Sequence, residues 1–313
     1  MQMSLVSDVD IISSPLNYIG GKYKLLPQIL PLFPKVEGTF IDLFCGGCNV
    51  GINVPAAKTI FNDTNQNLIY LYNALKNLDK DILFEMIDEI ISKYSLSRSD
   101  INGYSFYGCE SSSGLGAYNK EGFLRLRDDF NNHTNFEYRY YVMLYILVVY
   151  SFNNQIRFNR EGKFNLPVGK RDYNEKMQDK LSLFVDRLKE GNYEFSCIDF
   201  EELDISSFES KDFIYADPPY LITCATYNEQ DGWNAEKEKA LYVFLDKATD
   251  SEIKFALSNV LSSEGKENRL LIEWLEKNKS RYNTIHLNYN YSNSNYQKKD
   301  RTTGSDEVLI TNY

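Results

Sequence analysis

The sequence is poor in histidine, with only His133 and His286 among its 313 residues. A histidine-based metal site or a Ser–His–Asp triad is therefore poorly supplied. The five cysteines form an odd, scattered set, which argues against a disulfide framework and indicates reduced thiols (residues 45, 48, 109, 197 and 224). Cys45 and Cys48 have the spacing of a half zinc site, but no second cysteine pair stands at ligand spacing. We therefore expect no metal.

Long hydrophobic runs are also missing. The richest stretch, YYVMLYILVVY (140–150), is too short to span a bilayer and indicates a buried helix or strand. The first residues lack a basic stretch followed by an apolar run, the pattern of a secretory signal. We therefore expect a cytoplasmic protein that does not bind membranes.

Positive charge is in deficit, with a net charge of −10. At first sight this argues against a nucleic-acid partner. Locally the balance reverses, because residues 153–173 contain five basic and two acidic side chains, and KKDR at 298–301 forms a second small patch. Such runs are most often solvated faces, but a local patch is enough to contact phosphates.

Strand and helix patterns alternate along much of the chain. Apolar runs predict strands at 38–47, 56–63, 193–200, 212–217, 253–260, 284–291 and 307–313, and helical spacing predicts helices at 65–78, 80–94, 236–249 and 268–278. This alternation is typical of an α/β sheet with helices on both faces. The middle of the chain breaks it: 95–121 is expected to be a surface excursion, 122–131 and 137–154 helical, and 156–169 a β-hairpin.

A glycine-rich turn follows the first predicted strand. In DLFCGGCNVG the glycines are Gly46, Gly47 and Gly51, and Asp63 lies at the end of the next predicted strand, 21 positions after Asp42. Bare backbone allows a ligand to approach closely, and an acid at the second strand accepts hydrogen bonds from ribose hydroxyls. The phosphate-binding pattern G-x-G-x-x-G is absent. An adenosine-bearing ligand without phosphates and an ordinary strand–turn–helix both remain open.

The stretch ADPPY (216–220) places an acid at the end of the buried strand FIYA, where open α/β sheets carry their sites. Two prolines hold the backbone extended and remove two N–H donors, so a carbonyl is free to point outward. A carboxylate beside a fixed carbonyl makes a clamp for an –NH₂ group, and Tyr220 supplies a flat surface for a planar ring. The alternative is a proline-rich turn with a capping aspartate.

These motifs, in this order, resemble the Dam-type DNA adenine-N6 methyltransferases (α group, D12 class), which use S-adenosylmethionine (SAM). SPLNYIGGKYKLL (14–26) resembles the N-terminal cofactor motif, FIDLFCGGCNVG the glycine loop, FNDTNQNLIYLYN the ribose-binding segment, and YADPPY the catalytic tetrad. FNNQIRFNREGKFNLPVG resembles the DNA-reading hairpin, and KFALSNV and DEVLITNY the last strands. The similarity covers most of the chain.

The resemblance implies a Rossmann-like methyltransferase sheet, formed by residues 1–66 and 176–313, and an inserted, mainly helical target-recognition domain at 67–175. It implies a target adenine flipped out of the duplex, stacked on Tyr220, with its amine hydrogens accepted by Asp217 and the Pro218 carbonyl before in-line transfer. The expected catalytic residues are Asp217, Pro218, Pro219 and Tyr220. The expected cofactor-binding residues are Tyr18, Lys22, Asp42, Phe44, Gly46, Asp63, Asp199 and Asp217.

The resemblance also implies double-stranded DNA as partner, with GATC or a related site as the target. Arg157 is the candidate for a bidentate guanine contact and Gln155 for an adenine edge. Phe152 and Asn153 would fill the gap left by the flipped base. Contacts to phosphates and support of the hairpin are expected from Asn159, Lys163, Asn165, Pro167, Lys170 and Arg171. A separately acting restriction endonuclease as functional partner is left open.

Two positions depart from the family pattern. Cys48 stands where the family often has a second loop glycine, so a need for positive φ or close approach there would weaken cofactor binding. Gln155 occupies a position that is often apolar in members reading GATC.

Other methylation reactions fit the sequence less well than adenine methylation. A cytosine-C5 reaction is disfavoured, because no cysteine follows a proline. Cytosine-N4 methylation, methylation of RNA or of a protein glutamine amide, and a catalytically inactive DNA-binding relative remain as alternatives.

Overall fold

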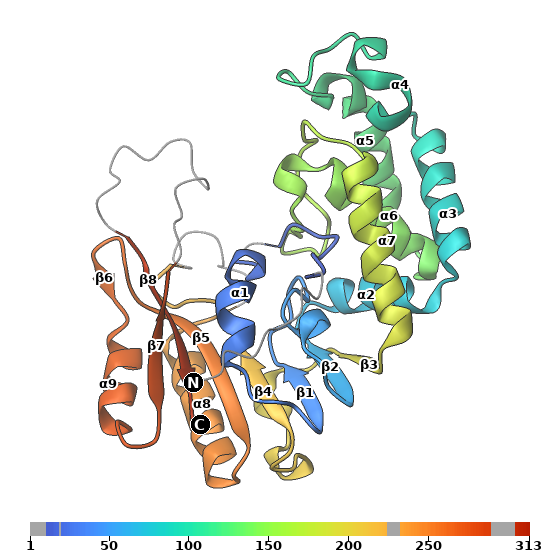
Figure 1. Ribbon diagram of the computed structural model, residues 1–313. Coiled ribbons are helices and arrows are strands. Elements are labelled where there is room, and N and C mark those ends of the chain that lie inside the picture. The colour runs from blue at the N-terminus through green and yellow to red at the C-terminus, as the bar shows by residue number, and fades with distance from the viewer. Residues whose placement is uncertain (1–10, 19, 224–231, 289–303) are drawn as a thin grey trace. The chain divides into compact units, whose positions relative to one another are not determined.

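The computed structural model describes residues 11–18, 20–223, 232–288 and 304–313. Cys224, the KKDR patch and the end of the predicted strand 284–291 lie outside these residues. The chain divides into two compact units (Figure 1). The sheet unit comprises 22–45, 54–69 and 192–313, and the helical unit comprises the residues up to 21, 46–53 and 70–191.

The sheet unit is built on an eight-stranded sheet in the order β3-β2-β1-β4-β5-β8-β7, with β6 paired to β5. The strands β1 to β5 that neighbour one another are parallel, and β8 is antiparallel to both β5 and β7. Their bounds are β1 Thr39–Asp42, β2 Lys58–Asn62, β3 Tyr193–Ser196, β4 Phe213–Ala216, β5 Lys254–Ser263, β6 Lys266–Glu267, β7 Asn283–Leu287 and β8 Asp306–Thr311. The predicted α/β fold, a mostly parallel sheet flanked by helices, is confirmed.

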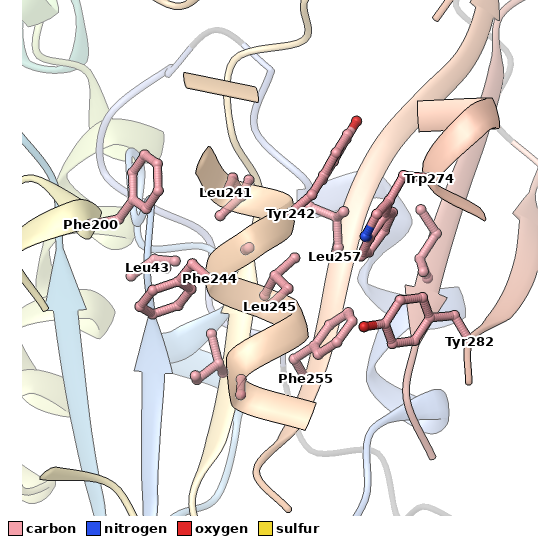
Figure 2. Packing of buried hydrophobic residues seen from close by; sticks show 14 of the residues in the cluster. Leu43, Phe200, Leu241, Tyr242, Phe244, Leu245, Phe255, Leu257, Trp274 and Tyr282 are labelled. Carbon is pink, nitrogen blue, oxygen red and sulfur yellow. The ribbon is translucent and has the colours of Figure 1, made fainter. Parts of the chain in front are cut away.

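Side-chain alternation along the strands divides the core of the sheet unit between two faces. On one face, Phe40, Phe213 and Tyr215 lie near the ring of Phe33, which follows the short helices α1 (Leu26–Ile29) and η2 (Leu30–Leu32). On the other face, α8 (Ala235–Asp250) and α9 (Arg269–Lys277) cover the sheet. Figure 2 shows Leu241, Phe244 and Leu245 of α8 packed in this layer with Phe255 and Leu257 of β5. Each fully buried leucine contributes about 2 kcal/mol to folding.

The helical unit is organised around α6 (Tyr138–Tyr150), in which every residue from Tyr140 to Tyr150 is buried. A helix that is apolar on all sides must be surrounded, and α6 packs against α3 (Lys80–Lys93) and α5 (Gly116–Asn131). The other helices are α4 (Ser99–Phe106), α7 (Glu175–Glu190) and the 3₁₀ turns η3 (Gly51–Asn53) and η4 (Phe152–Asn154). The boundary between the two units falls within α2 (Gln66–Asn77).

Two segments differ from the sequence expectation. The region 95–121, expected to be an irregular excursion, contains α4 and the start of α5, and no helix was predicted where α7 lies. The predicted hairpin at 156–169 turns back on itself, but it does so through two isolated antiparallel bridges, Ser151 with Val168 and Phe158 with Phe164. In the described ranges, no helix is both long enough and apolar enough to cross a bilayer.

Candidate active site

The carboxyl ends of β1, β2, β3 and β4 lie along one edge of the sheet, because these strands are parallel neighbours. Four residues singled out from the sequence follow these ends in turn: Phe44, Asp63, Asp199 and Asp217. The chain runs outward from β1 to β2 on one side and reaches β4 on the other, so the strand order reverses between β1 and β4. Ligands of open α/β sheets bind at such a reversal.

Asp217, directly after β4, belongs to a cluster of four side chains in the sheet unit. Lys22 Nζ lies 3.0 Å from Asp217 Oδ1 and 3.3 Å from Glu307 Oε1. The hydroxyl of Tyr220 lies 3.0 Å from the same Asp217 oxygen and 3.1 Å from the same Glu307 oxygen. Because a tyrosine hydroxyl carries one hydrogen, it donates fully to one carboxylate at a time. Two carboxylates therefore share two donors.

Burial sets the electrostatics of this cluster. The side chains of Lys22 and Glu307 are 4% and 1% exposed, and that of Asp217 is 17% exposed. Burial raises the pKa of the Asp217 carboxyl above its ordinary value; Lys22 opposes this shift and the charge of Glu307 adds to it. Burial alone would lower the pKa of Lys22, but the two carboxylates outweigh it and raise that pKa. Lys22 is therefore a charged group at neutral pH.

The tetrad around Asp217 has a local structural basis. All four residues of β4 are buried, and Tyr215 makes a 2.8 Å hydrogen bond with Ser258 of β5 that fixes the end of the strand. Pro218 and Pro219 then stop the ladder, since neither has an N–H to donate. Tyr220 lies with its ring 4.9 Å from Lys22 Nζ, so the ammonium occupies one face of the ring.

Phe44 and Asp63, two further predicted cofactor residues of the sheet unit, follow the neighbouring strands β1 and β2, and each contacts other residues of that unit. Phe44 forms an aromatic group with Phe200 and Trp233, at centroid distances of 5.6 and 5.5 Å. Asp63 accepts a 2.8 Å hydrogen bond from the backbone N–H of Asn65, which shapes the turn after β2.

Asp199 makes a helix-capping hydrogen bond and an ion pair that the sequence did not predict. It caps a 3₁₀ turn, η5 (Phe200–Glu202), and forms a 2.7 Å ion pair with Lys237. Its pKa is lowered by the hydrogen bond from Lys237, although burial opposes the shift. Asp42 is the last residue of β1 and is buried.

Tyr18 and Gly46 belong to the helical unit and contact each other. Gly46 has a φ of +44°, and a Cβ placed on it would lie 2.9 Å from the ring of Tyr18. Its carbonyl accepts a 2.8 Å hydrogen bond from the hydroxyl of Tyr72. Cys48, fully buried, has a φ of +57°. The left-handed backbone that favours glycine is thus present at Cys48, the position where this chain departs from the family pattern.

Replacing Gly46 by alanine is expected to lower the free energy of unfolding by about 2–3 kcal/mol, because the left-handed backbone costs about 1 kcal/mol and the contact with Tyr18 adds a similar amount. Gly265 is the matched control, since its φ of +78° is also left-handed but nothing lies within 4 Å of its added Cβ. Gly265→Ala should cost only the backbone contribution in chemical denaturation. Equal losses at the two positions would show that the contact with Tyr18 is unimportant.

The predicted DNA-binding residues all lie in the helical unit, on η4 and the hairpin that follows it. Arg157 is exposed, and its Nε donates a 2.8 Å hydrogen bond to Asn165 Oδ1 across the hairpin. The side chain of Asn159 accepts hydrogen bonds from the backbone of Glu161 and Lys163, so it shapes the tip of the turn. Asn165 and Asn159 thus support the turn, and the exposed Arg157 lies across it with its guanidinium against Asn165.

The flanks of the hairpin carry the other predicted contacts. Phe152 is 51% exposed, an unusual position for a phenylalanine, and the Pro167 carbonyl accepts a 2.9 Å hydrogen bond from its N–H. Asn153 has a φ of +58°. Gln155 is half-buried, and Lys163, Pro167, Lys170 and Arg171 are exposed. The hairpin therefore presents an aromatic ring and several cations to solvent.

Three residues that contact the predicted site residues of the sheet unit were not predicted from the sequence. Glu307 was not singled out, although it is an acid at the start of a buried strand, which is the one signal that could have found it. Phe200 and Trp233 were also missed. The pattern Asp-Phe at the end of a predicted strand could have indicated Phe200, whereas nothing in the sequence placed Trp233 near Phe44.

Comparison with known proteins adds independent evidence. The family model described as D12 class N6 adenine-specific DNA methyltransferase matches residues 18–293. The chain is 41% identical over 309 residues to the type II methyltransferase M.FokI of Planomicrobium okeanokoites, covering 96% of this chain and 43% of that protein. It is 41% identical over 308 residues to the modification methylase StsI of Streptococcus sanguinis, with the same coverage.

A more distant relative is the DNA adenine methylase of Escherichia coli K12, which is 24% identical over 268 residues, 84% of each chain. The chain spans less than half the length of M.FokI and StsI. The family match covers most of the residues, including the Asp217 tetrad, Lys22 and the hairpin. This chain therefore belongs to the family of D12 class N6 adenine-specific DNA methyltransferases.

Proposed function

We propose that this protein transfers the methyl group of SAM to N6 of adenine within a short site in duplex DNA. The observation that carries the proposal is the Asp217 carboxylate, which follows the carboxyl end of β4 and is oriented by Lys22 and Tyr220. Family membership supports the reaction class. In this proposal Asp217 and its neighbours in the sheet unit perform catalysis, and the hairpin of the helical unit reads the DNA.

The residues along the carboxyl edge of the sheet fit SAM. Phe44 offers an aromatic surface for an adenine ring, and Asp63 offers a carboxylate for ribose hydroxyls at the end of β2. When bound, SAM supplies a methyl group on a sulfonium, which is the electrophile for the amine nitrogen.

The contacts of Asp217 determine how it would hold the target amine. Lys22 and Tyr220 both contact Oδ1, so we expect Oδ2 to accept one amine hydrogen and the Pro218 carbonyl the other. Accepting these hydrogens leaves electron density on the nitrogen available for attack. Because the Lys22 ammonium lies over one face of the Tyr220 ring, the extruded base would stack on the other face. Catalysis in this scheme comes from positioning and electrostatics.

The test is a methylation assay with duplex DNA of mixed sequence and SAM, followed by mass spectrometry of the released nucleosides. N6-methyl-2′-deoxyadenosine as the product supports the proposal, and long-read sequencing of the same DNA gives the recognised site. N4-methyl-2′-deoxycytidine would instead assign the chain to the alternative base. No methylated nucleoside, with SAM still bound in calorimetry, would contradict transfer to DNA.

Arg157→Ala is expected to relax the base preference at one position of the site and to cost about 1–3 kcal/mol of specific binding, because a bidentate base contact is lost. Lys163→Ala is the matched control on the same hairpin. A lost phosphate contact should weaken binding to all sequences alike and reduce its salt dependence. Competition binding with single-base variants of the site measures both. If the two variants behave alike, Arg157 does not read a base.

M.FokI is a type II methyltransferase and StsI is a modification methylase. We extend this to the present chain as a proposal: its methylation protects a DNA site that a separately acting restriction endonuclease cuts. Resistance of the methylated DNA to such an endonuclease would support this role.

A further inference from the structure

The carboxylate of Glu238, in the first turns of α8, is completely buried. It accepts four hydrogen bonds, all from neutral donors. Trp233 Nε1 donates to Oε2 at 2.7 Å, and Tyr242 Oη, Asn259 Nδ2 and Asn268 Nδ2 donate to Oε1 at 2.6, 3.0 and 3.2 Å. Burying a carboxylate is costly even when it is hydrogen-bonded, so this arrangement calls for a reason.

The partners of Glu238 prevent it from turning. Asn268 caps α9 through its side-chain oxygen, which accepts from the Leu271 N–H at 3.2 Å. The side-chain oxygen of Asn259 in β5 accepts from the Val260 N–H at 2.8 Å. Three donors tied to α8, α9 and β5 therefore hold one carboxylate oxygen, and the other oxygen is left directed at the indole of Trp233.

The indole that Glu238 holds belongs to the aromatic group at the carboxyl edge of the sheet. Trp233 meets Phe44 edge-on, with an interplanar angle of 89°, and its centroid lies 6.0 Å from that of Phe200. Phe44 follows β1, and Phe200 follows β3. Trp233 and Phe44 are only half-buried, so the group is not sealed inside the core. Partly open aromatic surfaces at this edge suit a planar, apolar ring.

We propose that Trp233 forms one wall of the site for the adenine ring of the cofactor, and that Glu238 is the positioning residue that fixes the plane of its indole. This inference rests on the proposed function and identifies the part of the site that selects the nucleoside end of SAM. Glu238 acts through Trp233 and does not itself contact the cofactor.

Glu238→Gln isolates the contact with Trp233. The three donors that contact Oε1 keep the amide oxygen of the glutamine in that position. The amide NH₂ then faces the indole N–H, and because both groups are donors they cannot form a hydrogen bond with each other. The indole then loses its anchor while α8 keeps its length and most of its contacts. Trp233→Phe keeps an aromatic ring but removes the indole N–H. In that background Glu238→Gln has no hydrogen bond to this ring to break.

The measurement is binding of SAM, of its demethylated product and of adenosine by calorimetry, to the four combinations of these two substitutions. Glu238→Gln is expected to weaken all three ligands about five- to tenfold in the presence of Trp233, and by less than about twofold in the Trp233→Phe background. A purely structural role for Glu238 predicts the same change in both backgrounds, and that result would overturn the inference.

A spectroscopic reading does not depend on any substitution at the site. The chain contains two tryptophans, Trp233 and Trp274, so 5-fluorotryptophan labelling gives two ¹⁹F resonances, which Trp274→Phe assigns. Adenosine is expected to shift the Trp233 resonance and to leave that of Trp274, which stacks on Tyr242 in the core, unchanged. A Trp233 resonance that does not shift at saturating SAM would refute this inference but not the proposed function. A wild-type protein that binds no SAM would refute the proposed function itself.

Discussion

Asp217→Asn is expected to lower the single-turnover rate of methyl transfer at least about a thousandfold, while the affinity for SAM changes by less than about threefold. Lys22 and Tyr220 both donate to Oδ1, so the amide oxygen of asparagine takes that place and its NH₂ takes the place of Oδ2. The variant then presents a donor to the adenine amine, which is itself a donor. Rapid-quench methylation of a duplex with excess enzyme measures the rate, and calorimetry measures SAM binding.

Asp306→Asn is the matched control for this experiment. Asp306 is next to Glu307 in the chain, but its side chain is 39% exposed and contacts His286. The same chemical change there should leave the rate within about twofold of wild type. An Asp217→Asn enzyme that methylates DNA at the wild-type rate would eliminate the amine clamp as the basis of catalysis.

Lys22→Met is expected to reduce the free energy of unfolding by about 3–5 kcal/mol and to abolish methylation. The substitution keeps an unbranched side chain in place but removes the ammonium that two buried carboxylates share, and such a loss leaves buried charge poorly compensated. Chemical denaturation at neutral pH measures the loss. Lys35→Met is the control, because Lys35 and its partner Glu37 are largely exposed and their ion pair should contribute little.

The loss of stability in Lys22→Met is expected to become smaller as the pH falls. The pKa of Asp217 is already raised in the folded protein, and removal of Lys22 raises it further, so the penalty in Lys22→Met is present at neutral pH and fades as the pH falls through that raised value. Adding Glu307→Gln should recover part of the lost stability without recovering activity. A deficit that stays constant from neutral to acidic pH would contradict this electrostatic origin.

The strands and the tetrad were predictable because they depend on short-range patterns. Parallel strands are buried on both faces and read as apolar runs, and the acid of YADPPY ends one of them. The aromatic and glycine signals near Tyr18 and Gly46 are equally local. The reaction class followed from the order of several such motifs rather than from any one of them.

The burial of Glu307 was not predictable, for a physical reason, whereas α7 was predictable. Glu307 is an acid at the edge of an apolar run, which usually means an exposed strand start; its burial depends on β8 pairing between β5 and β7. Its partner Lys22 lies near the other end of the sequence. In α7, the buried positions Leu181, Phe184, Val185 and Leu188 recur at helical spacing, so the sequence carries the signal for this helix although the prediction lacked it. The hairpin was recognised from its turn residues, but its few bridges depend on support from neighbours such as Asn131.

The residues of the cluster around Asp217 come from distant parts of the sequence, so the ribosome adds them at different times. Lys22 is synthesised before Asp217 and Tyr220, and Glu307 follows them with β8, which is inserted between β5 and β7. A nascent or truncated chain that stops short of β8 can hold the tetrad but lacks the carboxylate that shares its donors. Under the proposed function, we expect a chain that stops before β8 to be inactive.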